Sequence, residues 1–143
     1  MPSVVSIHRV AVRRGPAEPL EAAEVVASHG IQGDYRSGHA GRHVTLIEAE
    51  AIATVAEKLG VKVPVDASRR QIVVEGIRLN DLVGQRLRVG SVVLDIHELC
   101  HPCQRMESTV GPGAKAAMEG IGGVCARVIE GGAIRPGDPV YLV

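Results

Sequence analysis

The segment RLRVGSVVLDIH, residues 86–97, decides the fold class. Apolar residues recur on both sides of Gly90, and Val, Leu and Ile dominate each half. Two β-prone runs that flank a glycine are typical of two strands joined by a tight turn. The sequence therefore predicts a β-hairpin centred on Gly90.

Further short runs of the same kind lie on both sides of this hairpin, separated by glycine and proline. About seven short strands with little helix between them favour a mainly β (α+β) fold, because a parallel doubly wound sheet needs several more helices. We therefore expect a β-barrel with a helical insertion. The further strands are predicted over Val4–Val12, Glu24–Ala27, Arg42–Ile47, Gln71–Glu75, Ile77–Leu79, Val124–Glu130 and Val140–Val143.

Two segments follow a helical period instead. The apolar residues of Glu48–Leu59 recur on one helical face, and Gly60 follows as a left-handed C-cap. Ala114–Met118 has the composition of a single short helical turn. The helical insertion is expected to consist mainly of the first segment.

The length and composition are those of an ordinary globular protein. With 143 residues and 15.0 kDa, we expect a single domain over residues 1–143. Apolar residues make up 45% and the 16 basic residues equal the 16 acidic ones, which argues against disorder and against general polyanion binding. The sequence has neither a long apolar run nor a secretory leader, so we expect a cytoplasmic protein without a membrane partner.

The numbers of aromatic and basic residues indicate which kinds of ligand the protein is suited to bind. Phe and Trp are absent and only Tyr35 and Tyr141 are aromatic, so stacking platforms for nucleobases are missing and no nucleic acid partner is expected. Of the basic residues 13 are Arg and 3 are Lys, and Arg binds phosphate or carboxylate through two parallel hydrogen bonds. Neither nucleotide-binding glycine motif is present.

The strongest chemical signal is LCHPCQR, residues 99–105, which contains Cys100, His101, Cys103 and Arg105. Four interpretations compete. In the first, the cysteines are small buried apolar residues, and in the second they bind zinc together with a histidine. In the third they form a dithiol redox pair, and in the fourth one thiolate is presented to a metal or to a transferable sulfur atom. The irregular surroundings favour the last interpretation. Cys125, inside a predicted strand, fits the first.

Two further segments carry polar chemistry. Gly30 to Gly41 contains Gly33 and Asp34, followed by Arg36, His39 and, just beyond it, Arg42. Glycines let a ligand approach the backbone, and Arg and His donate to an anion, although a solvated hairpin loop has the same composition. Arg69 and Arg70 precede a strand and are open to the same two interpretations. The three loops together suggest a shared rim.

At this point the chain resembles a known family. The blocks that carry the resemblance are GIQGD (30–34), RHVTLIEAE (42–50), RRQIVVEGI (69–77), CHPC (100–103), GGVCARV (122–128) and GDPV (137–140). In this order they resemble the MOSC domain, named after the C-terminal part of molybdenum cofactor sulfurase, in a stand-alone bacterial form. The resemblance implies a β-barrel of the type found in the barrel domain of pyruvate kinase.

The resemblance also implies a cofactor. In relatives that bind molybdenum cofactor, the cysteine at the position of Cys103 supplies a thiolate to molybdenum, and Cys100 lies beside it. The phosphate and pterin of the cofactor would be met by the Gly33–Asp34 loop and by cationic side chains. The pyridoxal phosphate domain of the large sulfurases has no counterpart here, so that cofactor is not expected. The cationic candidates are Arg36, His39, Arg42, Arg69, Arg70 and Arg105.

Several functions are compatible with this resemblance. The leading expectation is a molybdenum-dependent oxidoreductase that reduces N-hydroxylated small molecules, or a protein that handles cofactor sulfur as a sulfurtransferase. An external electron donor or sulfur donor protein is then expected as a partner, because no flavin or haem motif is visible. The alternatives are a sulfur carrier with a persulfide on Cys103, resolved by Cys100, and a non-catalytic chaperone for the cofactor.

Overall fold

The hairpin predicted around Gly90 is present in the computed structural model, which describes residues 1–38, 42–101, 107–108 and 110–143. Strands β7 (Arg86–Val89) and β8 (Val92–Leu99) pair antiparallel. Gly90 joins them at a φ of 58°, in the left-handed region that favours a residue without a Cβ atom. The rest of the sheet extends from this hairpin.

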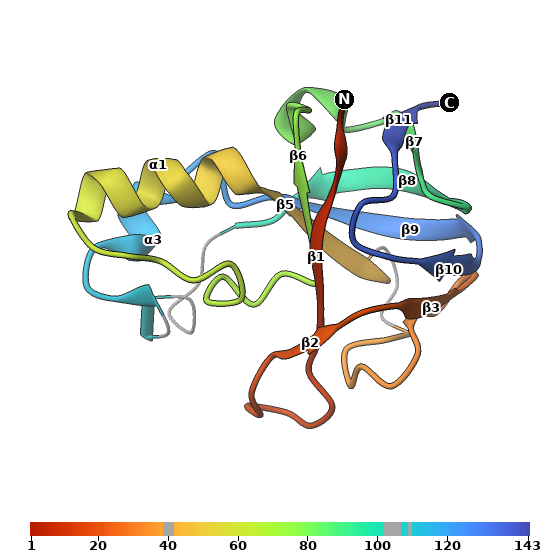
Figure 1. Ribbon diagram of the computed structural model, residues 1–143, viewed down its shortest axis with the longest axis horizontal. Helices are drawn as coiled ribbons and strands as arrows, with labels where there is room; N and C mark the ends of the chain where they lie inside the picture. Colours follow the sequence, from red (N-terminus) through yellow and green to blue (C-terminus); the bar gives the residue numbers. More distant parts are fainter. Residues whose placement is uncertain (39–41, 102–106, 109) are drawn as a thin grey trace.

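The described strands form two sheets (Figure 1). The strands beyond the hairpin are β1 (Ser3–Arg9), β2 (Glu18–Leu20), β3 (Ala23–Val26), β4 (Gly30–Ile31), β5 (Val44–Glu48), β6 (Ile72–Glu75), β9 (Val124–Glu130), β10 (Gly132–Ile134) and β11 (Val140–Leu142). The larger sheet has the order β11-β7-β8-β9-β5-β6-β1-β2, and the smaller has the order β10-β3-β4. The prediction of a mainly β fold is confirmed.

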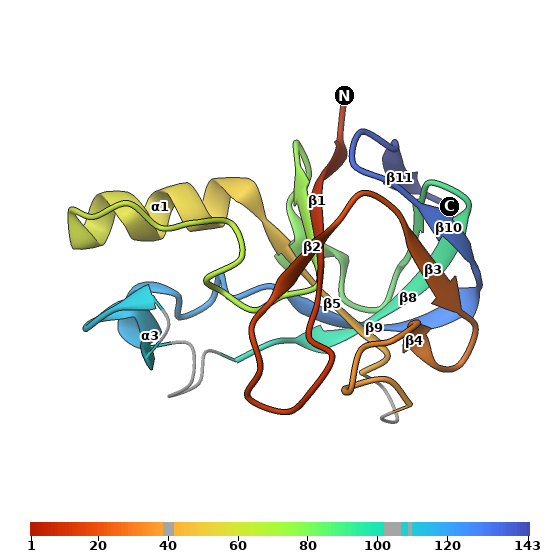
Figure 2. The same ribbon diagram turned by 60° about the horizontal axis from the view of Figure 1, so that its bottom comes forward.

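Helix α1 (Ala49–Leu59) is the predicted long helix and serves as a crossover. It connects β5 to β6, which pair parallel, and parallel neighbours need such a connection. Gly60 ends the helix in the left-handed conformation, at a φ of 68°. The short helix α3 (Ala114–Ala117), also predicted, lies on the same side of the sheet as α1 in Figures 1 and 2.

Strands β5 and β6 are buried on both faces because each contributes to two apolar clusters. Leu46 and Ile72 belong to the main core, enclosed by the two sheets. Ile47 and Val73 point the other way, into a smaller cluster with α1 and α3 that includes Val55. The alternation of side chains along a strand therefore leaves Thr45 and Gln71, one residue before Leu46 and Ile72, on the face that α1 covers only in part.

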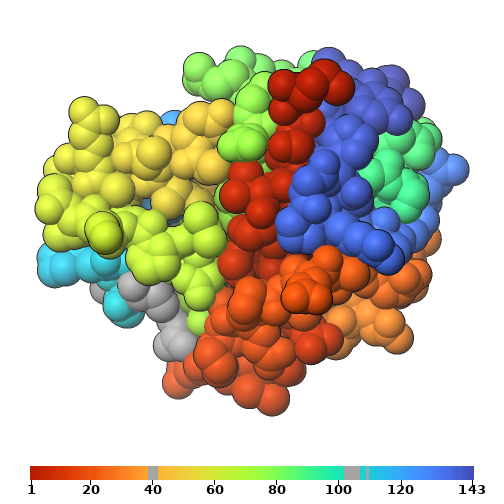
Figure 3. Space-filling view, in the orientation of Figure 1, coloured from red at the N-terminus to blue at the C-terminus, as the bar shows by residue number. Residues whose placement is uncertain are grey.

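The predicted barrel does not close, because β2 and β11, the strands at the two ends of the larger sheet, do not pair with each other. The second half of β1 pairs with β2, from Ile7 to Arg9. The first half lies against residues 137–140 through backbone hydrogen bonds, from the Val4 N–H to the Asp138 carbonyl at 2.9 Å and from the Val140 N–H to the Pro2 carbonyl at 3.1 Å. These bonds form an isolated bridge, Ser3 with Pro139, and not a strand ladder. In Figure 3 this first half of β1 lies between the residues around β6 and the C-terminal segment. The larger sheet is therefore open, with β2 and β11 at its described edges.

Other predictions of single elements differ from the structure. Ile77–Leu79, predicted as a strand, leads instead into a 3₁₀ turn over Leu79–Leu82, because Glu48 Oε2 accepts the Leu79 N–H at 3.2 Å. The short strands β2, β4 and β10 were not predicted, since each is two or three residues long and is defined by its partner rather than by its own pattern. None of the described helices is long and apolar enough to span a bilayer.

Gly123 is a constraint at the junction of β5 and β9. Its φ is 96°, and a Cβ atom there would lie 2.1 Å from the Leu46 carbonyl oxygen. We expect Gly123→Ala to lower the free energy of unfolding by on the order of 3 kcal/mol or more, because backbone atoms must move. Urea denaturation measures this change.

Gly120→Ala is the matched control. Gly120 also has a positive φ, 79°, but nothing lies within 4 Å of an added Cβ atom, so only the backbone preference is lost, about 1 kcal/mol. Equal losses for the two variants would contradict the close approach of Gly123 to β5.

Candidate functional site

A polar group interrupts the apolar face of the sheet where β5, β6 and β9 lie side by side. Thr45 is the antiparallel partner of Cys125, and the parallel register of β5 with β6 brings Gln71 alongside. The Thr45 backbone N–H donates to Gln71 Oε1 at 2.8 Å, and the Gln71 N–H donates to Thr45 Oγ1 at 3.1 Å. These reciprocal bonds fix both side chains across a parallel strand pair.

A pocket of about 320 Å³ opens over this group. Its described lining residues are Tyr35, Arg36, Arg42, Thr45 and Gln71. Gln71 is 2% exposed, and its amide nitrogen has no hydrogen-bond partner among the residues that the structure describes. A buried donor without a partner is costly, so its place in a pocket wall is best explained by a ligand or water that accepts from it.

Asp34 holds the loop that forms one wall of the pocket. Its two oxygens accept from the Arg36 backbone N–H at 2.8 Å, from the Arg36 guanidinium at 2.8 and 2.9 Å, and from the Val10 N–H at 3.0 Å. Burial alone would raise the pKa of Asp34, but these bonds outweigh it and hold the pKa below its usual value. Both oxygens are thus engaged within the chain.

Arg36 has a mixed role. Its charge is paired with Asp34 at 2.8 Å, its Nη1 donates to the Arg69 carbonyl at 2.7 Å, and its guanidinium lies 5.8 Å from the centre of the Tyr35 ring. It still lines the pocket. Arg36 therefore shapes the wall and presents a charge that Asp34 partly neutralises.

The structure gives the other predicted loop residues roles within the chain. Gly33 has a φ of 89°, and a Cβ atom there would lie 2.8 Å from Arg9 Nη1. Arg69 donates to the Gly15 carbonyl at 2.9 Å. Arg70 is buried and donates from Nε to the Gly122 carbonyl at 2.8 Å and from Nη2 toward the His101 carbonyl at 3.5 Å. Neither of these two arginines is among the described lining residues of the pocket.

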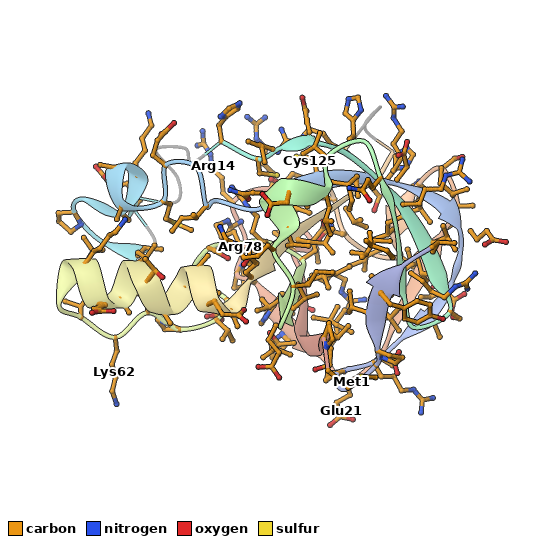
Figure 4. The ribbon with its side chains drawn as sticks, turned by 90° about the horizontal axis from the view of Figure 1, so that it is seen from above. Met1, Arg14, Glu21, Lys62, Arg78 and Cys125 are labelled. Carbon is orange, nitrogen blue, oxygen red and sulfur yellow. The ribbon has the colours of Figure 1, made fainter. Side chains whose placement is uncertain are left out.

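Two buried thiols and one arginine form the second part of the site. Cys100 follows the end of β8 and Cys125 lies on β9; both are free cysteines and both are buried. The electrostatics of Arg42 are dominated by its burial and by these two cysteines. Burial would lower the pKa of Arg42, but the two thiols outweigh burial and raise it, so the guanidinium stays charged. Figure 4 shows Cys125 on the side of the molecule opposite Met1.

The prediction that Cys125 is a small buried residue is confirmed, since it is 1% exposed. Thr45, Gln71 and Tyr35 were not predicted as pocket residues. The available signal for the first two was the alternation along β5 and β6, which turns Thr45 and Gln71 away from the main core. The predicted residues Cys103, His39 and Arg105 lie outside the described residues. Within the described part of the chain, no group of three or more His, Cys, Asp or Glu side chains is arranged to hold a metal ion.

The ion pair of Asp34 gives a pH-dependent prediction. The pKa of Asp34 is lowered on folding, so its contribution to stability is complete above the unfolded value of 3.8 and is lost as the pH falls through the folded pKa. Asp34→Asn should lower the free energy of unfolding at pH 7 by about 2 kcal/mol, because it removes charged hydrogen bonds. Urea denaturation from pH 7 down to pH 3 should show this gap narrowing at the acid end.

Asp81→Asn provides the control, because Asp81 is exposed and the same change of side chain there should alter stability little at any pH. A constant gap between wild type and Asp34→Asn across the pH range would contradict the ion-pair explanation.

The chain was compared with models of protein families and with curated proteins, and one family matches. Residues 33–141 match the family model of the MOSC domain. No match is found among curated proteins. The matched segment contains Asp34, Arg42, Gln71 and both described cysteines.

Solved structures of low sequence identity share the fold. The YuaD protein from Bacillus subtilis has a TM-score of 0.76 at 16% identity, covering 98% of this chain and 94% of that one. YiiM from Geobacillus stearothermophilus has a TM-score of 0.82 at 18% identity, covering 100% of this chain and 75% of that one. YiiM from Escherichia coli has a TM-score of 0.75 at 16% identity, with coverage of 100% and 70%. At these identities the likeness establishes the fold alone.

Proposed function

The chain belongs to the MOSC domain family, and from this premise we propose that it binds molybdenum cofactor in the pocket lined by Arg42, Thr45 and Gln71. The observation that carries the proposal is the unpartnered amide nitrogen of Gln71, which is buried in the wall of that pocket. The volume of about 320 Å³ lies at the lower end of the range of small-molecule sites, roughly 300–1,000 Å³.

The chemistry of the lining residues suits an anionic, oxygen-rich ligand. The Gln71 amide, Arg42 and Arg36 are hydrogen-bond donors, and two of the three are cations. A pterin that carries a carbonyl oxygen and a terminal phosphate offers acceptors to such a set. The residues present therefore fit the organic part of the cofactor.

We assign the contact with the terminal phosphate of the cofactor to Arg42. Arg69 and Arg70 donate to backbone carbonyls and hold the loops around residues 15, 101 and 122. Arg36 is paired with Asp34, which reduces the charge it offers to a ligand. Arg42 lines the pocket and, among the residues that the structure describes, forms no ion pair with a carboxylate.

Cys103 remains the proposed metal ligand, carried over from the family resemblance. A sulfur-rich molybdenum centre accepts a further thiolate readily, because thiolates are soft ligands. Cys100 precedes it by three residues, and its backbone N–H donates to the Gly123 carbonyl at 2.8 Å. This bond ties the start of the cysteine loop to β9, beside the pocket.

The activity we propose is the reduction of N-hydroxylated small molecules to the parent amine or amidine and water. The reaction consumes two electrons and two protons, and an external protein would supply the electrons. The cofactor, when bound, supplies a metal that changes its oxidation state by two electrons. The contribution of this chain is to orient the ligand through the Gln71 amide and to balance its charge with Arg42.

Gln71→Glu tests the role of the amide. Glutamate keeps the size and keeps one oxygen that accepts from the Thr45 N–H, but it replaces the pocket donor with an acceptor. We expect about tenfold less bound pterin after purification from a host that makes the cofactor, because the lost donor also becomes repulsive. Oxidation to a fluorescent pterin, with molybdenum analysis, measures occupancy.

Gln85→Glu is the matched control, since Gln85 is exposed and lies outside the described lining of the pocket. Wild-type occupancy in both variants, with folding verified by circular dichroism, would show that the pocket is not the cofactor site.

Cys103→Ser tests the proposed metal ligand. We expect loss of molybdenum with a retained fold, because a serine hydroxyl is a poor ligand for a soft metal. Inductively coupled plasma mass spectrometry reports the metal content, and thermal denaturation reports the fold. Full metal content in this variant would overturn the assignment of Cys103.

The reductase activity has its own test, in which molybdenum-loaded wild type is given hydroxylaminopurine and an artificial electron donor. Failure to reduce hydroxylaminopurine would overturn the proposed activity.

A further inference from the structure

A second pocket, of about 260 Å³, lies beside α1 and shares no described lining residue with the pocket proposed for the cofactor. Glu48, at the end of β5, lies at one end of its wall, while Arg78 and Ile121 come from the segments that follow β6 and α3. Residues spaced by four, which are neighbours on one face of a helix, continue the wall along α1: Glu50, Thr54 and Lys58. The proposed cofactor chemistry makes no use of this pocket.

Glu48 is a buried carboxylate that the chain satisfies only in part. Its side chain is 9% exposed, and its Oε2 accepts the Leu79 N–H at 3.2 Å. Its Oε1 has an ion pair with Arg78 Nε at 3.9 Å, which is beyond hydrogen-bond distance, and the Arg78 side chain is 74% exposed. A carboxylate that is removed from water needs close donors, so Glu48 can accept from a further cationic donor that enters the pocket.

The charges around Glu48 support the same conclusion. Burial raises the pKa of its carboxyl group above the usual value, and the carboxylates of Glu50 and Asp81 act in the same direction. The Leu79 N–H and Arg78 act in the opposite direction but do not outweigh them. The cations of the chain therefore do not compensate the charge of Glu48, and an ammonium group in the pocket would.

The other end of the wall is basic. Lys58 is exposed and forms no ion pair with a carboxylate among the residues that the structure describes. It follows Glu50 by eight residues, about 12 Å along the helix axis, and side chains on a helix lean back toward its N-terminus. The remaining lining residues in the described part of the chain, Ala51 and Ile121, are apolar. The pocket thus combines an acidic end, an apolar surface and a basic end.

We propose that this pocket binds a small ω-amino acid, with the ammonium group of the ligand on Glu48 and its carboxylate on Lys58. The two charges of an α-amino acid are separated by a single carbon and are too close together to reach both ends. A chain of several methylene groups spans the distance and packs against Ala51 and Ile121. The volume of about 260 Å³, just below the range of roughly 300–1,000 Å³ for drug-sized ligands, suits a molecule of this size.

The first test compares three six-carbon probes by isothermal titration calorimetry with the purified wild-type protein. ε-Aminocaproate carries both charges, caproate only the carboxylate and hexylamine only the ammonium group. ε-Aminocaproate should bind with a dissociation constant in the millimolar range or tighter. Caproate should bind about tenfold more weakly, because buried Glu48 repels it, and hexylamine about fivefold more weakly, because the contact it lacks is with exposed Lys58. Absence of ε-aminocaproate binding, or equal affinity for either singly charged probe, would overturn the proposal.

The second test assigns the ammonium contact to Glu48. Glu48→Gln keeps an oxygen for the Leu79 N–H and removes the charge, so ε-aminocaproate should bind about tenfold more weakly. Glu57→Gln is the matched control, since Glu57 is an exposed glutamate on α1 outside the described lining of the pocket. Wild-type affinity in Glu48→Gln, with the fold verified by circular dichroism, would contradict this contact.

The third test assigns the carboxylate contact to Lys58. Lys58→Ala should lower the affinity for ε-aminocaproate about fivefold and leave the affinity for hexylamine unreduced, because hexylamine has no carboxylate. Lys62→Ala is the control, because Lys62 points away from the molecule in Figure 4 and is outside the described lining. An unchanged affinity of Lys58→Ala for ε-aminocaproate would overturn the proposal. Lys58 is exposed, so this variant gives a result even if Glu48→Gln fails to fold.

Discussion

The structure depends on β5 having no solvent face. One side of this strand is packed against the main core and the other against α1 and α3, so every side chain of Val44–Glu48 is buried. A polar residue in such a strand must find partners within the protein. Thr45 finds them in Gln71 through two short bonds, and this pairing places the remaining donor of the amide at the wall of a pocket. The polar site is thus a consequence of how the core is built.

The arginines around the pocket divide into two groups according to the partners that the chain gives them. Arg69 and Arg70, next to Gln71, hold surrounding loops by donating to carbonyl groups, so the approach to β6 is rigid. Arg36 is locked by Asp34, whose buried carboxylate needs compensation. Arg42 precedes β5 and lines the pocket. Arginines that are alike in the sequence therefore separate into cations held by the chain itself and one cation, Arg42, that lines the pocket without a carboxylate partner among the described residues.

Much of the fold was predictable from the sequence, because the long elements carry their own pattern. Residues 86–97 gave the hairpin, and the apolar spacing before Gly60 gave α1 with its C-cap. The closed barrel was wrong, because the first half of β1 meets the C-terminal segment in an isolated bridge while its second half pairs with β2, and which of these contacts extends into a ladder is decided by tertiary packing. The site was predictable only in part. The arginines and Cys100 were visible as residue types, but the pairing of Thr45 with Gln71 and with Cys125 depends on strand register, which no local pattern specifies.

We propose that the pocket over Thr45 and Gln71 holds the molybdenum cofactor. Anomalous diffraction at the molybdenum edge, on crystals of protein purified with its cofactor without oxygen, locates the metal directly. The account predicts one strong peak at the mouth of this pocket, on the side where the loop after Cys100 begins, with pterin density reaching the Gln71 amide and Arg42. A peak elsewhere on the molecule, or pterin density that does not contact Gln71, would contradict it.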